Sequence, residues 1–317
     1  MSVIPAKLDS SINPFDSWKS LSISLYMTLA GYAVLVGVPV ISTAWVNLLG
    51  FSEVQVGRVA GADLGGLSVG AVATSLLISS VSRRQIIILG ILIACVSNAA
   101  CISIVNYESV LWLRFLAGFG SGLITATAVS CLGASSRPAL AFNAMLFAFA
   151  FSQAAEMHFL PMLSMQNIYI TFIICFLIIV PFLRWVPDKG PSQVASPIER
   201  SDQLEDNVPK YVTWLCLSAI VITYVNIGAY WTYIELAAAS DNTDPEWVGS
   251  VLTWSSFCSL IGCLFATLLS NKFGLLRPLL VTLVCQASIV GMLANGVTNT
   301  NILISVFSFN CLWIFID

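Results

Sequence analysis

The residues best suited to chemistry in this sequence are ionisable side chains inside long apolar stretches. They are Asp63, Arg114, Glu156, His158 and Glu235. A charge in hydrocarbon costs about 2.5 to 3.5 kcal/mol on insertion scales, so such a residue usually faces a partner or a wet cavity. We therefore expect one of two kinds of chemistry, reversible proton binding by a carboxylate or a buried ion pair.

Composition identifies the apolar stretches as membrane spans. The 317 residues are 58% hydrophobic and only 9% charged, with a mean hydropathy of +0.90, whereas soluble domains carry about 25% charged residues. The runs reach the roughly 20 residues that a helix needs to cross a bilayer, and they lack the alternation of membrane β-strands. We predict an all-α polytopic membrane protein with ten spans, at residues 22–48, 55–79, 85–105, 110–133, 138–160, 167–186, 211–236, 247–270, 276–296 and 300–316.

One long polar segment divides these spans into six and four. Residues 187–210, PDKGPSQVASPIERSDQLEDNVPK, are rich in proline, serine and charge, as expected of a flexible linker. We therefore predict an N-terminal six-helix bundle at 1–186, a cytoplasmic linker at 187–210 and an incomplete four-span bundle at 211–317.

The basic residues indicate the orientation of the chain. Of its thirteen Lys and Arg residues, eleven lie at the N-terminus or in alternate connections, among them the adjacent Arg83 and Arg84. The other two, Arg58 and Arg114, lie within predicted spans. By the positive-inside rule the N-terminus is cytoplasmic, and we expect a multi-pass protein of a bacterial inner membrane.

With this orientation, the ionisable residues share the outer half of the membrane. Asp63 lies about eight residues, roughly 12 Å, into its span, and Arg114 lies at a similar depth. Pairing of Arg114 with Asp63 or Glu156 would relieve the desolvation of both partners. For Asp63 and Arg114 a static structural pair is an equally good interpretation, for Glu156 we favour proton binding, and for His158 an interfacial position.

The two groups of spans show an internal repeat. Gly70 and Gly262 are 192 residues apart, and the same offset aligns Tyr32 with Tyr224 and the motif VGRV with VGSV. Two halves of equal topology joined by a linker imply parallel repeats about an axis normal to the membrane, an arrangement typical of transporters.

Together these features resemble the major facilitator superfamily, whose halves have six spans each. The family's loop after the second span reads roughly G-x-L-x-D-R-x-G-R-R, of which Leu77, Arg83 and Arg84 match. The family motif R-x-x-Q-G in the fourth span is met from Arg114 to Gly118 except for one alanine. The Gly-Pro motif that marks the fifth span of drug/proton antiporters is absent. In the second half, the loop motif is kept in part at Asn271, Lys272 and Gly274.

The resemblance implies roles for particular residues. The first, fourth, seventh and tenth helices would line a central cavity, which makes Tyr32, Arg114, Tyr224, Asn226 and Trp231 candidates for substrate contact. The candidates for proton coupling or a buried ion pair are Asp63, Glu156, His158 and Glu235. The candidates for an inner gate are Arg83, Arg84, Asn271, Lys272 and Gly274.

The implied function is secondary transport of a small solute across the cytoplasmic membrane by alternating access, with proton coupling as an option. Two alternatives stay open, a ten-span drug/metabolite-type exporter and an integral-membrane lipid-modifying enzyme. The repeat offset of 192 opposes the first, and the lack of a cluster of acids or histidines opposes the second. Because the family has twelve spans, we expect a C-terminally truncated carrier whose full-length form transports.

No cofactor or metal is expected. The nine cysteines lie within predicted spans without metal-ligand spacing, and no nucleotide-binding loop is present. A net charge of -3 argues against nucleic acid as a partner. The expected partners are the lipid bilayer and an unidentified small-molecule substrate, and we expect a monomer.

Overall fold

The computed structural model describes residues 13–188, 210–240, 243–262, 276–294 and 296–316. Within these ranges it contains ten helices of twelve or more residues and no strand, so the all-α prediction is confirmed. The first half consists of α1 (Trp18–Leu49), α2 (Glu53–Leu77), α3 (Arg83–Ser103), α4 (Tyr107–Gly133), α5 (Pro138–Phe159) and α6 (Met165–Ile179). The second half consists of α8 (Lys210–Ser240), α9 (Pro245–Ser256), α11 (Leu276–Ala294) and α12 (Asn299–Ile316). Short 3-10 turns are η1 (Pro14–Asp16), η2 (Leu160–Met162) and η3 (Val180–Trp185).

Local sequence explains where the helices begin and end. Serine residues cap α1, α2, α3 and α6, and two of them, Ser52 and Ser82, form capping boxes with the glutamine three residues later. Gly50 ends α1 with a φ of 71°, a left-handed conformation that favours glycine. In the described chain, α1 to α4, α5 with η2, and α6 with η3 are long and apolar enough to cross a membrane. The predicted spans of the first half therefore match the helices to within a few residues.

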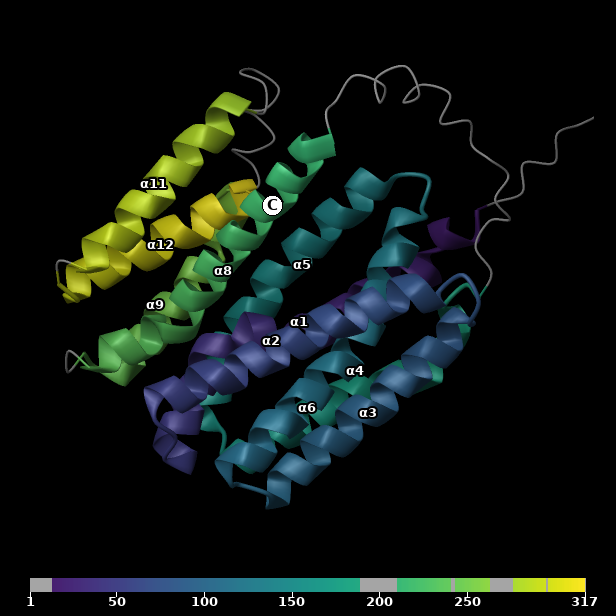
Figure 1. The fold of residues 1–317 in the computed structure, drawn as a ribbon, viewed down its shortest axis with the longest axis horizontal. Coiled ribbons are helices and arrows are strands. Elements are labelled where there is room, and N and C mark those ends of the chain that lie inside the picture. Colours follow the sequence, from purple (N-terminus) through teal and green to yellow (C-terminus); the bar gives the residue numbers. More distant parts are fainter. Residues whose placement is uncertain (1–12, 189–209, 241–242, 263–275, 295, 317) are drawn as a thin grey trace, which may run out of the picture.

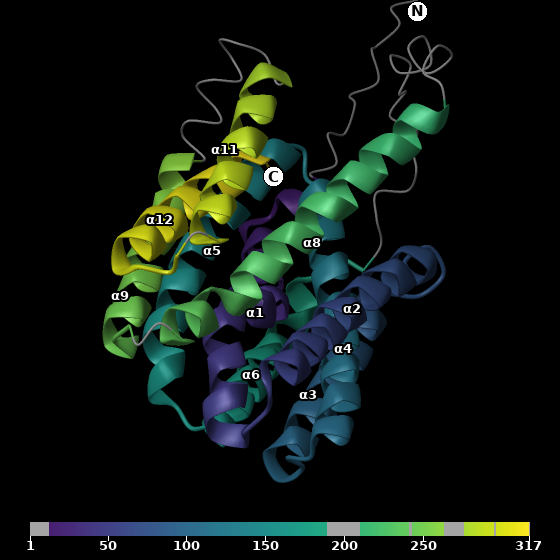
Figure 2. The ribbon, with the colours of Figure 1, turned by 60° about the vertical axis from the view of Figure 1, so that its left-hand side comes forward.

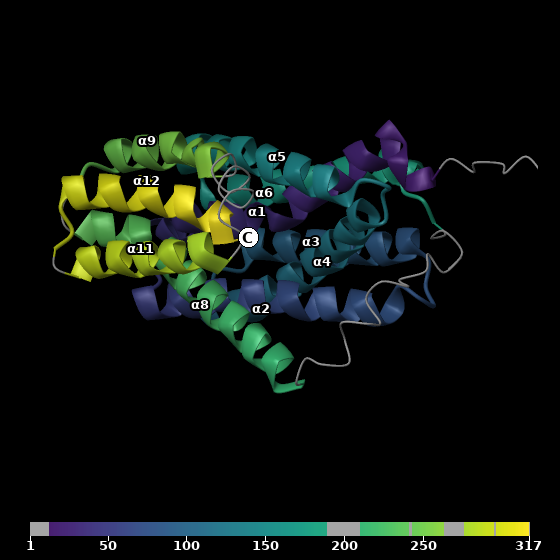
Figure 3. The ribbon, with the colours of Figure 1, turned by 90° about the horizontal axis from the view of Figure 1, so that it is seen from above.

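The helices form two adjacent groups (Figure 1). Helices α1 to α6 form one bundle, and α8, α9, α11 and α12 lie beside it, as the turned view in Figure 2 also shows. The groups meet where α8 lies against α1 and α9 against α5. Seen from above, α8 crosses the other helices obliquely (Figure 3). Most of the predicted linker 187–210 lies outside the described residues, which stop at 188 and resume at 210, so the domain limits stay a prediction.

Helix α4 approaches α2 unusually closely because both present glycine at the contact. A Cβ added at Gly66 or Gly70 of α2 would collide with carbonyl oxygens of α4, and one at Gly118 or Gly122 of α4 would collide with carbonyl oxygens of α2. On the other side of α4, Gly120 lies against α3, where an added Cβ would be 2.6 Å from a carbonyl oxygen. The glycine spacing in the sequence therefore marks a real helix contact.

The same spacing does not mark a contact everywhere. At Gly61 and Gly65 no described heavy atom lies within 4 Å of an added Cβ. At Gly57 the neighbour is the Tyr233 hydroxyl of α8 rather than a helix backbone. Four-residue spacing reports which residues share a helix face, but not whether another helix covers that face.

The repeat is visible as one contact made twice. Gly70 faces the carbonyl oxygen of Phe119, and Gly262 faces the carbonyl oxygen of Cys311. Both members of the second pair lie 192 residues after those of the first. The offset found in the sequence therefore relates equivalent helix contacts in the two halves, as parallel repeats require.

Candidate functional site

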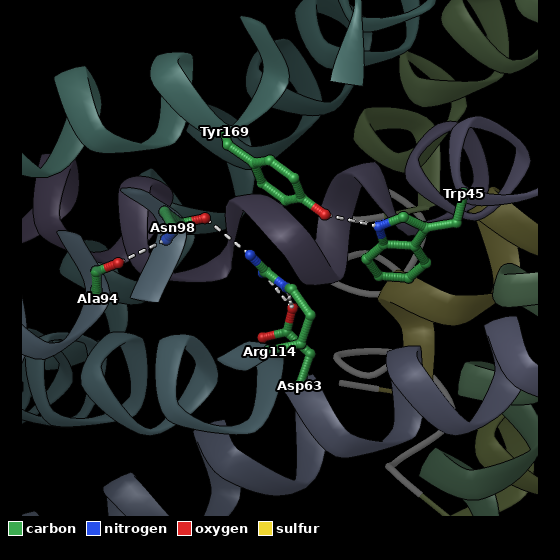
Figure 4. A network of polar contacts seen from close by, with 6 residues as sticks. All are labelled: Trp45, Asp63, Ala94, Asn98, Arg114 and Tyr169. Carbon is green, nitrogen blue, oxygen red and sulfur yellow. Dashed lines mark hydrogen bonds and ion pairs between the residues drawn. The ribbon is translucent and has the colours of Figure 1, made fainter. Parts of the chain in front are cut away.

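A buried polar network lies at the centre of the first half (Figure 4). Arg114 of α4 forms an ion pair with Asp63 of α2, and its Nε also donates to Asp63 Oδ2 at 2.7 Å. The Nη1 group of Arg114 donates to Asn98 Oδ1 of α3 at 2.8 Å. The guanidinium lies 5.7 Å from the ring centroid of Tyr169 of α6, whose hydroxyl accepts from Trp45 Nε1 of α1 at 3.1 Å. One network thus connects five helices.

This network explains how two charges are held in an apolar bundle. Asp63 and Arg114 are 3% and 1% exposed, so each would be strongly destabilising without the other. Gly118 makes the pairing possible, because the absence of a side chain there lets α2 approach α4 at Asp63. The sequence suggested Arg114 as a cavity-lining residue for substrate contact. The structure instead places it in this buried ion pair, and it does not line the cavity described next.

A cavity lies between the two halves. Its volume is about 320 Å³, and its walls come from α1, α5, α8, α12 and Ser259. Tyr32 and Tyr224, two of the predicted substrate-contact residues, occupy equivalent positions of the repeat, and both line the cavity. Gln153 and Trp313 line it as well. Among the twelve described lining residues none is charged and five are aromatic, including Tyr32 and Phe149, whose rings make an edge-on contact at 5.6 Å.

Two neighbouring residues of α8 fasten this helix, one to the first half and the other within the second half. Trp231 is buried and donates from Nε1 to the carbonyl oxygen of Val36 at 3.1 Å. The neighbouring Tyr230 shares a 2.6 Å hydrogen bond with Ser305 of α12. Trp231 thus holds α8 against α1 beside the cavity, whereas Asn226 lies on an exposed face of α8 and does not line the cavity.

A second, uncharged network was missed from the sequence. Gln153 of α5 donates from Nε2 to Asn310 Oδ1 at 3.4 Å, and Asn310 Nδ2 donates to Ser255 Oγ at 3.0 Å. All three side chains are buried. These side chains carry no charge and so are not among the ionisable candidates, although an amide within a long apolar stretch is itself a usable signal.

The remaining carboxylates occupy two different environments. Glu235 of α8 lies beside Thr43 of α1, at the contact between the halves, and one of its oxygens is buried without a hydrogen-bond partner. Glu156 of α5 accepts from Ser152 Oγ at 3.0 Å, while its Oε2 is likewise buried without a partner. His158 is exposed next to Phe159.

The predicted gate arginines contact the end of the first half. Arg84 donates to the carbonyl oxygens of Val186 at 2.9 and 3.1 Å and of Arg184 at 3.3 Å. Arg83 donates to the Asp188 carbonyl oxygen at 3.4 Å and lies over Phe15. These contacts fasten the start of the linker region rather than joining the halves. The other gate candidates, Asn271, Lys272 and Gly274, lie outside the described residues.

The same end of the bundle is fastened to the N-terminal turn. Asp16 accepts a hydrogen bond from the Ser136 backbone N–H at 2.7 Å, and this bond, with nearby Arg137, holds the pKa of Asp16 below its ordinary value. Lys19 lies 5.9 Å from the ring centroids of Trp18 and Trp185. Basic and aromatic side chains therefore gather at one end, as they do at a membrane interface.

Comparisons with known proteins agree with this architecture. The family model of the Major Facilitator Superfamily matches residues 21–316. No curated protein matches the sequence. Among solved structures, the nucleoside transporter NupG has a TM-score of 0.69 at 11% identity, with 93% of this chain and 80% of that chain covered.

Two further solved structures have the same fold. The D-xylose-proton symporter has a TM-score of 0.65 at 15% identity, over 94% of this chain and 79% of that chain. The inward open xylose transporter XylE from E. coli has a TM-score of 0.67 at 14% identity, over 95% and 80%. The helical repeat, the cavity between its halves and the match along nearly the whole sequence lead to one conclusion: this chain belongs to the Major Facilitator Superfamily.

Proposed function

We propose that the protein is a secondary carrier that moves a small uncharged solute through the cavity between its halves by alternating access. The observation that carries this proposal is the composition of the cavity wall. Tyr32, Phe149 and Trp313 offer aromatic surfaces, and Gln153 and Tyr224 offer polar groups, without a charged side chain among the described lining residues.

Such a wall suits a solute that stacks on rings and exchanges a few hydrogen bonds. A charged solute would lose its hydration there without gaining a counter-charge. Arg114, the natural partner for an anion, already pairs with Asp63. Two structural neighbours are named for uncharged solutes, a nucleoside and D-xylose, which agrees with this choice.

Proton coupling is assigned to Glu235. Its carboxylate lies between α1 and α8, so rocking of the halves changes its surroundings, and its unpartnered oxygen can take up a proton. Asp63 is committed to Arg114, and His158 lies outside the cavity. We further propose that the basic end, with Arg83 and Arg84, faces the cytoplasm of a bacterial inner membrane. Membership of the superfamily favours a carrier over a ten-span exporter or a lipid-modifying enzyme.

The test is uptake by the 317-residue chain in proteoliposomes. Radiolabelled uridine and D-xylose would be compared with choline and lactate, each with and without an imposed proton gradient. We expect uptake of an uncharged solute, which Gln153→Leu lowers by about tenfold or more in kcat/KM, because a hydrogen-bonding partner is lost. Gln166→Leu, at an exposed position on α6, is the matched control and should transport normally.

The coupling residue has its own readout. Glu235→Gln should abolish proton-driven accumulation while solute exchange across the membrane continues, because only the proton site is removed. Uptake confined to choline or lactate would contradict the choice of an uncharged solute, and normal accumulation in Glu235→Gln would contradict the coupling assignment.

A further inference from the structure

A second cavity lies inside the first half and shares no lining residue with the one between the halves. Its volume is about 570 Å³, and α1, α5 and α6 provide its walls. On α5, the first cavity is lined by positions such as Phe149 and Gln153, and the second by Phe147, Phe151 and Glu156. The two cavities therefore flank the contact between α1 and α5.

The wall of the second cavity is mainly apolar, and Glu156 is its one charged residue among the described lining residues. Phe147 and Phe151 are 55% and 49% exposed, so these rings lie on the surface that a bilayer would surround. Leu29, Ala30 and Ala33 of α1 form the opposite wall. From Phe147 to Glu156 the helix rises by roughly 13 Å. The cavity is thus an elongated apolar pocket that ends at a carboxylate.

Glu156 lacks a counter-charge in this pocket. Its Oε1 accepts from Ser152, but Oε2 is buried without a hydrogen-bond partner. The Oε2 atom lies against Gly37 of α1, where an added Cβ would be only 2.7 Å away, so glycine is what makes room for it. Among the described lining residues there is no Lys, Arg or His, and the hydroxyl of Tyr26 already donates to the Cys175 carbonyl oxygen.

An apolar pocket with a single unpaired carboxylate is complementary to a cation on an apolar body. A volume of this size is typical of small-molecule sites. A metal ion would need several oxygen ligands, and no group of three or more suitable side chains occurs in the described part of the chain. We propose that this pocket binds lipophilic organic cations that enter from the bilayer, with Glu156 as their counter-ion.

The test is equilibrium binding to the purified 317-residue chain in nanodiscs, with tritiated tetraphenylphosphonium as the probe. We expect saturable binding that tetraphenylborate, an anion of the same shape, does not displace. Glu156→Gln should weaken the affinity by about tenfold or more, the effect of removing a charge-assisted contact, and Glu156→Asp should weaken it less. Ala148→Phe, which fills the pocket without changing charge, should also abolish binding.

Glu108→Gln, at an exposed position in the first turn of α4, is the control and should bind as the unaltered protein does. Elution as a single species shows whether each variant is folded. The proposal fails if Glu156→Gln binds tetraphenylphosphonium normally, if tetraphenylborate competes equally well, or if binding is not saturable. A Glu156 that always holds a proton would give the first result, because glutamine has the shape of the neutral acid. If Glu156→Gln does not fold, the comparison of the two probes and the Ala148→Phe variant decide. Because the measurement needs no transport, it can succeed or fail independently of the proposed carrier function.

Discussion

The two halves make the same helix contact but surround it with different polar chemistry. Gly70 faces the Phe119 carbonyl oxygen in the first half, and Gly262 faces the Cys311 carbonyl oxygen in the second. Beside the first contact lies the Asp63–Arg114 ion pair. Beside the second, Ser255 stands 192 residues after Asp63, and it accepts a hydrogen bond from Asn310, which stands 192 residues after Gly118.

The reach of the two networks also differs. The charged network connects helices of the first half only, whereas the uncharged one continues through Gln153 of α5 and so crosses between the halves. Breaking a buried ion pair leaves an uncompensated charge and is strongly destabilising, while exchanging one neutral hydrogen bond for another costs far less. Charge therefore suits a bundle that moves as one body, and neutral amides suit the boundary that must rearrange.

The largest expected effect comes from breaking the charged network. Arg114→Met leaves Asp63 buried and unpaired, and we expect a loss of about 3 to 5 kcal/mol in stability. This loss of stability is measured by thermal unfolding in detergent, with the disappearance of the single elution species as the signal. The double variant Asp63→Leu with Arg114→Met removes both charges and should unfold at a higher temperature than Arg114→Met alone. If Arg114→Met were as stable as the unaltered protein, the claim that the ion pair stabilises the first half would be wrong.

A smaller effect tests whether the two glycine contacts are equivalent. Gly70→Ala and Gly262→Ala each place a methyl group against a carbonyl oxygen, so both should be destabilising by about 1 to 3 kcal/mol and by similar amounts. The matched control is Gly61→Ala, where space is open. Since alanine favours helix over glycine by about 1 kcal/mol, this control should be neutral or stabilising. Thermal unfolding of the three variants, compared side by side, would reject the equivalence if only Gly70→Ala were damaging.

The smallest effect concerns the uncharged network. Asn310→Ala removes a buried amide and leaves the Ser255 hydroxyl without its donor, which should cost about 1 to 2 kcal/mol. Thermal unfolding should therefore place this variant between the unaltered protein and Arg114→Met. A loss as large as that of Arg114→Met would show that the boundary between the halves is as rigid as the first bundle.

Much of the fold was predictable because hydropathy and helix caps are local properties. A span such as 110–133 needs only its own composition to be recognised, and α4 covers it with three more residues at its start. The repeat was predictable because a close helix contact tolerates no side chain. Glycine therefore occurs at the equivalent position of both halves, and the 192-residue offset can be recognised in the sequence. Equal depth and opposite charge made Asp63 one of two partners expected for Arg114, the other being Glu156, and the structure pairs Arg114 with Asp63.

The cavities were less predictable. Asn226 and Tyr224 are two residues apart, yet only Tyr224 lines the cavity between the halves. The network of Gln153, Asn310 and Ser255 joins helices far apart in the sequence. An amide within an apolar span indicates that it needs a hydrogen-bond partner, but it does not identify that partner, so these particular contacts could not be predicted.

The sequence by itself determined that this is a helical membrane protein built from two related halves, because the cost of exposing polar backbone or charge to lipid acts on every segment separately. Only the tertiary structure decided that Arg114 is committed to Asp63 and that Glu156 ends an apolar pocket. Which side chains meet depends on how helices rotate and approach one another, and this geometry is set by contacts between segments that are distant in the chain.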